Sequence, residues 1–400
     1  MSGLFRRVVV GMSGGVDSSV AALLLKQKGF EVHGLYMKNW DGHEESGFCH
    51  GEKDAEDAEW VCKKLQISLK HVNFVKEYWN FVFSDLIKEY SEGWTPNPDI
   101  LCNRFVKFDC FKKHAFRQLG ADAIATGHYA NTSHGSFLQN YSKSDDVRLL
   151  LPTDLVKDQT LFLSQVHRED LKKVMFPLAN LKKCEVKKIA EQNGLERIAK
   201  KEESTGICFI GNRKFQIFID QYLNPVPGKF VDITTHEPVG EHTGIHHYTI
   251  GQNCKLPGRK HSYFVVDKNK DTQRILVAPG TNHPSLYSDL FFTTEPHWIS
   301  QQVDSQLSEG VLKCKFRSQN TNALLDCSIC RTQSNTLTVK LNTFLRGFAP
   351  GQFAVFYLGD ECLGSARIRA VGPSLYLQGM EFSQEIATTD PELKSVLAYQ

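Results

Sequence analysis

A strand-like apolar run that leads through a glycine-rich turn into a helix-like run is the feature that most constrains this chain. The run "RVVV" covers 7–10, the turn "GMSGGVDSS" covers 11–19, and "VAALLLKQKG" follows it. The β-branched residues favour a buried strand, and the apolar residues after the turn favour a helix that ends at Gly29. Such a junction presents backbone amides at a helix N-terminus, where anions bind. The sequence therefore predicts a phosphate-binding loop.

The loop lacks the lysine of the common nucleotide loop, GxxxxGK[ST]. Gly14 and Gly15 would let the backbone approach an anion closely, and Ser13 and Ser18 add hydroxyl groups. Asp17 would repel a phosphate unless a Mg²⁺ ion bridges the two. The alternative interpretation is a plain glycine turn with a Ser/Asp helix cap.

Strand and helix patterns alternate from residue 6 to about 127, which predicts an α/β domain with a parallel sheet covered on both faces. Ligands bind at the carboxyl ends of such strands, so the loops after Val10, Tyr36 and Thr126 are candidate sites. Residues 128–165 suggest a β excursion, and 166–223 suggest helices. The expected units are listed by range: a catalytic domain at 1–223, a small β-rich domain at 224–283, a β-barrel at 284–375 and a loosely ordered tail at 376–400.

The composition is that of a globular protein, with 41% hydrophobic and 23% charged residues among 400. No apolar run approaches the roughly 18 residues that span a bilayer, so we expect no membrane partner. The first residues, "MSGLFRR", are too short to read as a targeting peptide before the first strand. The formal net charge is only +2, so any binding of nucleic acid must depend on local basic patches. Eleven irregularly spaced cysteines indicate a reducing compartment.

Two of the cysteines lie in unusual local sequences. Cys102 ends "TPNPDILC" at 95–102, where two prolines predict an extended, rigid segment that presents Asn97 and Asp99. A helix expected from Asn103 would place Cys102 at its start, where the dipole lowers a thiol pKa. Cys208 lies in "ESTGICFIGNRKF", among basic residues that favour the thiolate. Taken singly, either cysteine is better explained by a structural role than by a catalytic one.

Several motifs occur together in one order. They are "MKNWD" (37–41), "TPNPDILCN" (95–103), "ATGHY" (125–129), "KDQTLFLSQ" (157–165), "STGICFIG" (204–211), "YTIGQ" (248–252) and "APGQFAVFY" (349–357). "SGGVDSS" after "VVVG" resembles the loop of the N-type ATP pyrophosphatases, and the whole set resembles the tRNA-specific 2-thiouridylases, the MnmA family. The resemblance runs from about residue 6 to 370.

The resemblance implies an enzyme that uses ATP and Mg²⁺ to convert the wobble uridine of tRNA to 2-thiouridine. ATP would activate the C2 oxygen and release pyrophosphate. Cys208 would carry a persulfide whose sulfur attacks C2, and Cys102 would then form a disulfide with Cys208. The residues implied for ATP are Gly11, Met12, Ser13, Gly14, Gly15, Val16, Asp17, Ser18, Met37 and Gly127.

The resemblance also implies a tRNA surface. Asn97, Pro98 and Asp99 would receive the target base, since an anticodon loop presents its bases unstacked. The other residues that match tRNA-contacting positions are His128, Lys157, Asp158, Gln159, Arg317 and Gln352. Trp94, Ser318 and the loop 253–260 depart from the family pattern and weaken the expected tRNA contacts there.

The implied partners are tRNAs for Lys, Glu and Gln and a persulfide donor or relay protein, with the chain acting as a monomer. "GDECLGSARI" (359–368) resembles the mitochondrial animal versions, so we expect a mitochondrial location, with the cytoplasm as the alternative.

Other histidine, cysteine and acidic patterns in the sequence are weaker indications of a functional site. "HHY" (246–248) and the group His43, Cys49 and His50 lack helical ligand spacing, and Cys327 with Cys330 lacks a second pair, so no metal site of protein ligands alone is expected. "EKDAEDAEW" (52–60) is interpreted as a solvated helix face.

Two other functions stay open. Another ATP pyrophosphatase ligase, such as a tRNA lysidine synthetase or an amide-forming synthetase, would not need Cys102 and Cys208. A sulfur carrier or redox-switched tRNA-binding protein would not consume ATP.

Overall fold

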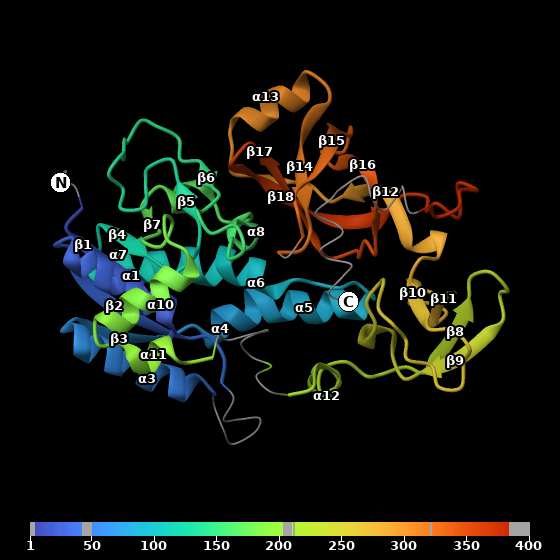
Figure 1. Cartoon of the computed structure of the whole chain (residues 1–400), viewed down its shortest axis with the longest axis horizontal. Coiled ribbons are helices and arrows are strands. Elements are labelled where there is room, and N and C mark those ends of the chain that lie inside the picture. The colour runs from blue at the N-terminus through green and yellow to red at the C-terminus, as the bar shows by residue number, and fades with distance from the viewer. Residues whose placement is uncertain (1–4, 42–49, 203–209, 211–212, 321, 384–400) are drawn as a thin grey trace.

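The computed structural model describes residues 5–41, 50–202, 210, 213–320 and 322–383. Within these ranges the chain forms a parallel sheet with helices, a small four-stranded sheet and a barrel. Figure 1 shows the parallel sheet in blue and green at one end, the small sheet in yellow at the other, and the orange barrel above them.

The first sheet has five strands in the order β3-β2-β1-β4-β7, and every pairing is parallel. The strands are β1 (Arg7–Met12), β2 (Glu31–Lys38), β3 (Ser68–Asn73), β4 (Ala123–Ala125) and β7 (Val174–Met175). Val8 and Val10 enter one hydrophobic core, and Val9 enters the core on the opposite face. The apolar run of β1 is therefore explained by burial on both faces, and the predicted parallel sheet is confirmed.

Helices cover both faces of this sheet. In chain order they are α1 (Val16–Gln27), α3 (His50–Leu65), α4 (Val75–Tyr78), η1 (Trp79–Phe83), α5 (Ser84–Ser91), α6 (Pro98–Leu101), η2 (Cys102–Cys110), α7 (Phe111–Leu119), α8 (Thr160–Leu163), α9 (Arg168–Leu171), α10 (Lys183–Gln192), α11 (Glu196–Ala199) and α12 (Phe215–Ile219). α1, α3, α10 and α11 bury apolar residues in one core, and α4 to α7 with η1 and η2 bury theirs in the other. Both η1 and η2 have π-helical hydrogen bonding.

The β excursion within the first domain pairs with the barrel. It consists of β5 (Asn131–Thr132) and β6 (Leu149–Leu150), which pair with each other. β6 also pairs with β18, where Leu150 lies opposite Glu361 and Leu149 opposite Cys362. The first domain therefore contributes two strands to the edge of another sheet.

The small sheet has the order β10-β11-β8-β9. Its elements are β8 (Gly228–Asp232), β9 (Pro238–His242), the short 3₁₀ helix η3 (Ile245–His247), β10 (Tyr263–Asn269) and β11 (Arg274–Pro279). Phe230, Val265, Ile275 and Val277 form its core together with Ile245. The alternation of these residues along their strands places one face of the sheet on this core.

The barrel is closed by the pairing of β12 with β18. Its elements are η4 (Pro284–Leu286), β12 (Tyr287–Thr293), β13 (His297–Trp298), α13 (Gln302–Ser308), β14 (Leu312–Arg317), β15 (Leu325–Arg331), β16 (Leu337–Arg346), β17 (Phe353–Leu358) and β18 (Glu361–Val371). Phe291, Phe316 and Phe356 are buried in its interior. The predicted C-terminal barrel is therefore confirmed.

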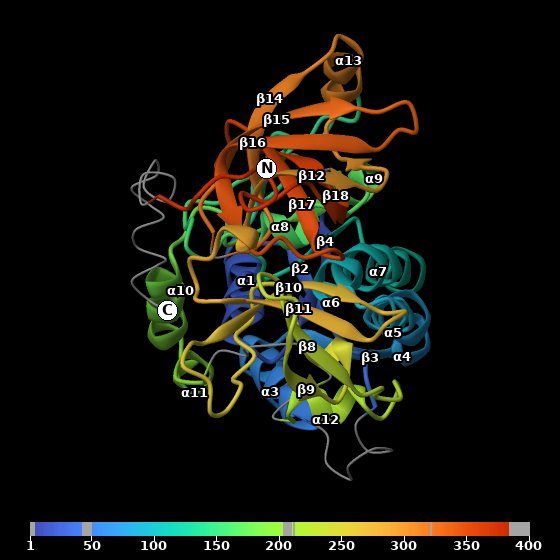
Figure 2. The same cartoon turned by 90° about the vertical axis from the view of Figure 1, so that its right-hand side faces the viewer.

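The barrel and the small sheet both contact α5 at the centre of the molecule. Arg367 of β18 pairs with Asp85 over 2.9 Å and also with Glu89. Lys270, from the turn after β10, pairs with Glu92. The turned view in Figure 2 also shows the barrel above the helical layer. Among the helices described, none combines the length and apolarity needed to cross a membrane.

Candidate active site

The predicted phosphate loop lies at the carboxyl end of β1 and leads into α1. Gly14 has a φ of +72°, and an added Cβ there would come within 2.3 Å of the Asp54 carbonyl oxygen. Glycine meets both demands, because it adopts positive φ readily and has no Cβ. The Ser13 N–H donates to Ser18 Oγ over 3.2 Å, and the two hydroxyl oxygens lie 3.1 Å apart. These serines close the loop over the first turn of α1.

The first turn of α1 is organised around the carbonyl of Gly15. Gly15 is the N-cap, in extended conformation, and its carbonyl accepts from Ser18 Oγ over 3.1 Å and from Ser19 Oγ over 2.8 Å. The first amides of a helix have no partner within the helix, and the helix end carries about half a positive charge. Backbone amides rather than a lysine are therefore the groups that could hold an anion at this point of the loop.

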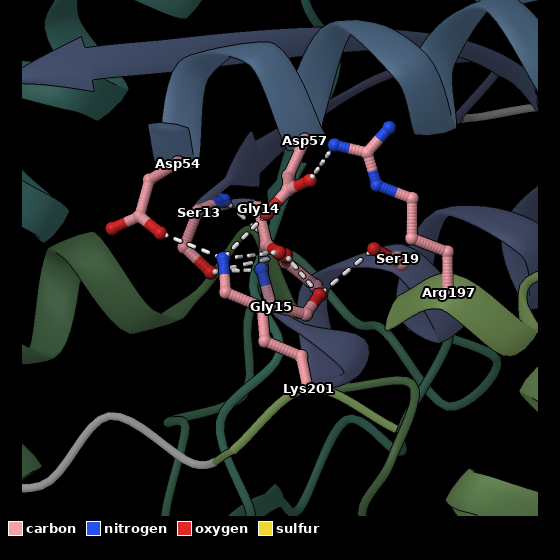
Figure 3. Close-up of polar contacts among 9 residues, drawn as sticks. Ser13, Gly14, Gly15, Ser19, Asp54, Asp57, Arg197 and Lys201 are labelled. Atoms are coloured by element: carbon pink, nitrogen blue, oxygen red, sulfur yellow. Dashed lines mark hydrogen bonds and ion pairs between the residues drawn. The ribbon is translucent and has the colours of Figure 1, made fainter. Parts of the chain in front are cut away.

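Lys201 connects the phosphate loop to two aspartates of α3. Its Nζ lies 2.8 Å from Asp54 Oδ1, 2.7 Å from Asp57 Oδ2 and 3.4 Å from the carbonyl oxygen of Gly14. Figure 3 shows these contacts, with Arg197 donating to the other oxygen of Asp57 over 2.6 Å. Burial alone would lower the pKa of Lys201, but its hydrogen bonds with the two aspartates outweigh burial and raise it. Lys201 therefore stays charged and links α3 to the loop.

This cluster corrects one expectation. The segment 52–60 was interpreted as a solvated helix face, yet Asp57 is buried and Asp54 reaches the phosphate loop through Lys201. The three-residue spacing places both carboxylates on one side of α3. Their partners lie 140 or more residues away in the chain, so local charge patterning gave no sign of them.

Asp17 has a lysine partner as well. Lys183 Nζ lies 2.8 Å from Asp17 Oδ1 and 2.7 Å from Oδ2, and the Tyr129 hydroxyl donates to Oδ1 over 3.0 Å. Lys183 is the first residue of α10, and no motif in the sequence marks it as part of the site. The loop therefore has a cation beside it, although the Walker lysine is missing from its own sequence. A Mg²⁺ ion at Asp17 stays a prediction.

The remaining residues assigned to ATP lie on neighbouring strand ends. Met37 is near the end of β2, and its Cε would lie 3.5 Å from a Cβ added at Gly11. Gly127 follows β4, and an added Cβ would come within 2.6 Å of Ser18 N. Met12 and Val16 are buried in the core under the loop. The carboxyl edge of β1, β2 and β4 therefore gathers the predicted residues, as expected for a parallel sheet.

The segment around Cys102 is helical from an earlier point than expected. α6 begins at Pro98, with Asn97 as its N-cap, and continues directly into η2, which starts at Cys102. The prediction of an extended segment up to a helix at Asn103 was wrong, because proline is well tolerated in the first turn of a helix. Cys102 is 3% exposed. It is thus a buried thiol inside a continuous helical segment, whereas the sequence placed it at the start of a helix.

Burial also affects the predicted base-binding residues. Removal from water raises the pKa of the Asp99 carboxyl, and Lys107 opposes this shift. Asn103 Nδ2 donates to the Asp99 carbonyl oxygen over 2.9 Å. The adjoining η2 is nine residues of π-helix, a rare conformation that occurs often at functional sites.

The barrel holds the segment before α6. Gln352 Nε2 donates to the Thr95 carbonyl oxygen over 2.7 Å, and the Thr95 N–H donates to the carbonyl of Pro350 over 2.8 Å. Gly351 has a φ of +96°, and a Cβ there would lie 2.9 Å from Thr95 O. Gln352, predicted to contact tRNA, is thus brought next to the predicted base-binding segment.

Cys208 and the loop around it lie outside the described residues. The described chain on either side is anchored, since Lys201 bonds to the phosphate loop and Ile210 joins the hydrophobic core that also contains Cys102. The predicted pairing of Cys208 with Cys102 stays a prediction.

Other predicted tRNA contacts lie near the end of β4. His128 Nδ1 is 2.8 Å from Thr126 Oγ1, and burial lowers the pKa of this imidazole to about 3, so it is neutral at physiological pH. Gln159 Oε1 accepts from the Tyr129 N–H over 2.9 Å. Lys157 is half-buried beside Leu155 and Val156, which are exposed. Their contact with tRNA stays a prediction.

Asp158 and Arg317 form an ion pair with each other. Their side chains are 1% and 5% exposed, and Arg317 also donates to Tyr357 Oη over 3.2 Å. Thr160 Oγ1 joins the same group, 3.1 Å from Asp158 Oδ2. In this conformation the pair joins β14 to the segment before α8. The tRNA contacts implied for these two residues stay predictions.

The described elements place a helix-end loop and a buried thiol in the same α/β domain. A loop of helix-end amides lies at one sheet edge with Lys183 beside it, and the helix that carries Cys102 packs against the same sheet. A parallel α/β domain with such a loop, followed by two β domains, defines the class of α/β nucleotide-binding proteins, which contains many families. The comparisons with known proteins identify which one.

Three family models match consecutive parts of the chain. They are the tRNA methyl transferase HUP domain over residues 6–212, the tRNA methyl transferase PRC-barrel domain over 216–279 and the aminomethyltransferase β-barrel domain over 288–368. A mitochondrial tRNA-specific 2-thiouridylase 1 of Drosophila melanogaster is 49% identical over 371 residues, 92% of this chain and 95% of that protein. The protein of the same name from Homo sapiens is 46% identical over 403 residues, 96% of each chain.

The chain belongs to the tRNA-specific 2-thiouridylase family. The predicted family, the prediction that the chain is an enzyme and the predicted mitochondrial location are thereby confirmed. Although the first family model is described as a methyl transferase domain, the relatives that align over the whole chain are named thiouridylases.

Proposed function

We propose that this enzyme uses ATP to replace the C2 oxygen of the wobble uridine in tRNA with sulfur. The observation that carries the proposal is a lysine-free phosphate loop in a chain that aligns over more than nine-tenths of its length with tRNA-specific 2-thiouridylases. Such a loop suits the release of pyrophosphate, because the departing group can be held by backbone amides at the start of α1.

ATP would lie at the carboxyl edge of β1, β2 and β4. Gly14, Gly15 and the first turn of α1 would hold its phosphates, and Met37 and Gly127 would lie near the adenine and ribose. Mg²⁺ fits beside Asp17, since Oδ2 keeps a lone pair while bonded to Lys183, whereas Oδ1 already accepts from both Lys183 and Tyr129. When bound, the ion would supply positive charge next to the phosphates.

The proposed chemistry has three steps. The uridine C2 oxygen attacks the α-phosphorus of ATP, and pyrophosphate leaves. The terminal sulfur of a Cys208 persulfide then attacks C2, and AMP leaves with the original oxygen. Finally the Cys102 thiolate attacks Cys208 Sγ, which forms a Cys102–Cys208 disulfide and releases 2-thiouridine. A thiol reductant and a persulfide donor restore the two cysteines.

Asn97, Pro98 and Asp99 would receive the base, because uracil offers one N–H donor and two carbonyl acceptors to a pair of polar side chains. Gln352 supports this role through its bond to the Thr95 carbonyl, since it fixes the segment on the barrel. His128, Lys157, Asp158, Gln159 and Arg317 are the further proposed contacts to tRNA. The proposed substrates are the tRNAs for Lys, Glu and Gln, and the enzyme is proposed to act as a monomer.

The test is a gel containing immobilised mercury, which retards thiolated tRNA. Unmodified tRNA with a wobble uridine is incubated with the protein, ATP, Mg²⁺ and a persulfide source. We expect a retarded band that requires ATP and is lost in Cys102→Ser and in Cys208→Ser. Cys330→Ser is the matched control, because Cys330 lies on β15 of the barrel and belongs to none of the predicted sites. We expect that variant to keep the band.

Release of AMP is measured in the same reactions. tRNA-dependent AMP release without any retarded band, in the wild type and in every variant, would overturn the sulfur chemistry and favour another adenylating ligase. A wild type that neither releases AMP nor retards tRNA would overturn the enzymatic proposal as a whole.

A further inference from the structure

Three side chains from two parts of the chain converge at the junction of α12 and the small sheet. His246 Nε2 lies 2.8 Å from Asp220 Oδ1, and His247 Nε2 lies 2.7 Å from the same oxygen. One ligand atom from each residue lies within 4.8 Å of the other two. Adjacent residues usually point apart, yet the 3₁₀ turn of η3 aims both imidazoles at one carboxylate oxygen.

The surroundings of the cluster hold it in place. Both histidine side chains are buried at 5–6% exposure, whereas the Asp220 side chain is 33% exposed. Thr243 Oγ1 lies 3.1 Å from His247 Nδ1, the ring nitrogen that faces away from Asp220. A residue that bonds the remote nitrogen of a metal-binding histidine fixes its tautomer and orientation. The cluster therefore has a support of the kind that metal sites have, and one side open to solvent.

We propose that Asp220, His246 and His247 form a binding site for a divalent transition-metal ion, with Zn²⁺ as the ion that fits best. Two imidazole nitrogens and one carboxylate oxygen are a ligand set that suits zinc, while Mg²⁺ and Ca²⁺ prefer oxygen alone. Three protein ligands leave a fourth position, which water would fill through the exposed side at Asp220.

The present contacts are close to what the ion needs. Tetrahedral zinc with bonds of about 2.0–2.1 Å places its ligand atoms roughly 3.3 Å apart, so the nitrogen–oxygen distances would open by about half an ångström. On binding, the proton of each Nε2 moves to Nδ1, so no net proton need be lost. For His247, that proton is then donated to Thr243 Oγ1, which lies at hydrogen-bond distance already.

The ion would join two domains. Asp220 directly follows α12, whose Phe218 is buried in the core of the first domain beside Phe83. His246 and His247 follow Ile245, which is buried in the core of the small sheet. A metal held by all three would therefore cross-link the small sheet to the helices of the first domain.

The test is a titration of the chelator-treated full chain with Zn²⁺, in competition with a chromogenic zinc chelator. We expect His247→Gln and Asp220→Asn each to lose one equivalent of bound zinc. Thr243→Val should keep the site but bind zinc about 10- to 100-fold more weakly. Asp220→Asn retains a carbonyl that can accept from the histidines, so it tests the charge with the least disturbance of the fold.

Cysteines also bind zinc, so two controls separate them from the site. Cys314→Ser, which changes a buried barrel thiol, should leave this equivalent unchanged. Cobalt bound at the proposed site should lack the thiolate charge-transfer absorption of a cysteine site. Equal zinc binding by the wild type, His247→Gln and Asp220→Asn would overturn the proposal, as would the absence of zinc binding by the wild type.

Discussion

Gly14 is the residue at which two separate demands meet, a positive φ and a close approach of the Asp54 backbone. Gly29 shares the first demand, with a φ of +84°, but a Cβ there would meet nothing within 4 Å. The two positions therefore separate the effect of backbone conformation from the effect of crowding under the loop.

We predict that Gly29→Ala lowers the free energy of unfolding by about 1–2 kcal/mol, the cost of a left-handed residue. Gly14→Ala should cost more, because the α3 backbone must move, and it should abolish the rise in melting temperature caused by ATP. Thermal unfolding with and without ATP checks both. Equal melting temperatures and equal ATP responses in the two variants would contradict this account of the loop.

The residues that the sequence predicted at this scale are those with local signals. Gly14, Ser13 and Ser18 were identified because a strand, a glycine turn and a helix follow one another directly. Lys183 and Lys201 were not, because each meets its carboxylate partner across more than 140 residues of chain. The local sequence does not distinguish one basic residue of a helical stretch from another, because only the tertiary structure determines which of them faces the loop.

At the scale of elements, β13 depends on a half-buried histidine. His297 Nε2 lies 3.1 Å from the carbonyl oxygen of Val166, which connects the barrel to the segment after α8. Burial lowers the pKa of His297 to about 4, and Arg104, His167 and Arg168 add to this shift. The folded protein thus holds this ring neutral where the unfolded chain would take up a proton.

We predict that the free energy of unfolding falls as the pH drops from about 6.5, the ordinary pKa of histidine, to about 4. In this window the unfolded chain binds a proton that the folded chain does not, and below it both are protonated. One such proton gives a slope of up to about 1.4 kcal/mol per pH unit. His297→Gln, which keeps an N–H donor, should reduce the slope by that amount in denaturant unfolding. Identical slopes would show that His297 does not titrate in this way.

Long elements were easier to predict than short ones. The alternation of strand and helix gave the first four strands of the parallel sheet, whereas β7 was missed because it has only two residues within a helical stretch. α6 was missed because Pro98 was read as a helix breaker, although a proline in the first turn leaves no intrahelical hydrogen bond unmade.

At the scale of the whole molecule, two cations, Arg367 and Lys270, join α5 and the turn after it to the other domains. Arg367 of the barrel reaches Glu89, which is buried, and packs over the Phe353 ring. Lys270 of the small sheet reaches Glu92, and both of these side chains are more than two-fifths exposed. The pairs differ chiefly in how far their charges are removed from water.

We predict that Arg367→Met lowers the free energy of unfolding by about 3 kcal/mol, because it leaves the Glu89 carboxylate buried without its cation. Lys270→Met should cost less than about 1 kcal/mol, as exposed ion pairs do. Methionine keeps the apolar stem in each case, so the comparison isolates the charge. Chemical denaturation of the two variants checks this, and similar losses would mean that burial of Glu89 does not govern the pair.

The arrangement of the domains was the part least accessible to sequence reasoning. The boundaries between strand-rich and helix-rich stretches are visible along the chain, but Arg367 and Asp85 are 282 residues apart. Nothing in a local pattern indicates that a buried carboxylate on one domain will need a guanidinium from another.

The pairing of β6 with β18 bears on how these domains have been inherited. β6, a strand from within the first domain, pairs with β18, the last strand of the barrel. The sheet of the barrel is therefore extended by residues that come from the first domain. A foreign barrel joined to this chain would have to offer the same edge to β6, or leave that edge open to pairing with other chains. Recombination at the linkers would therefore tend to produce insoluble proteins, and the N-terminal and C-terminal domains are expected to descend together.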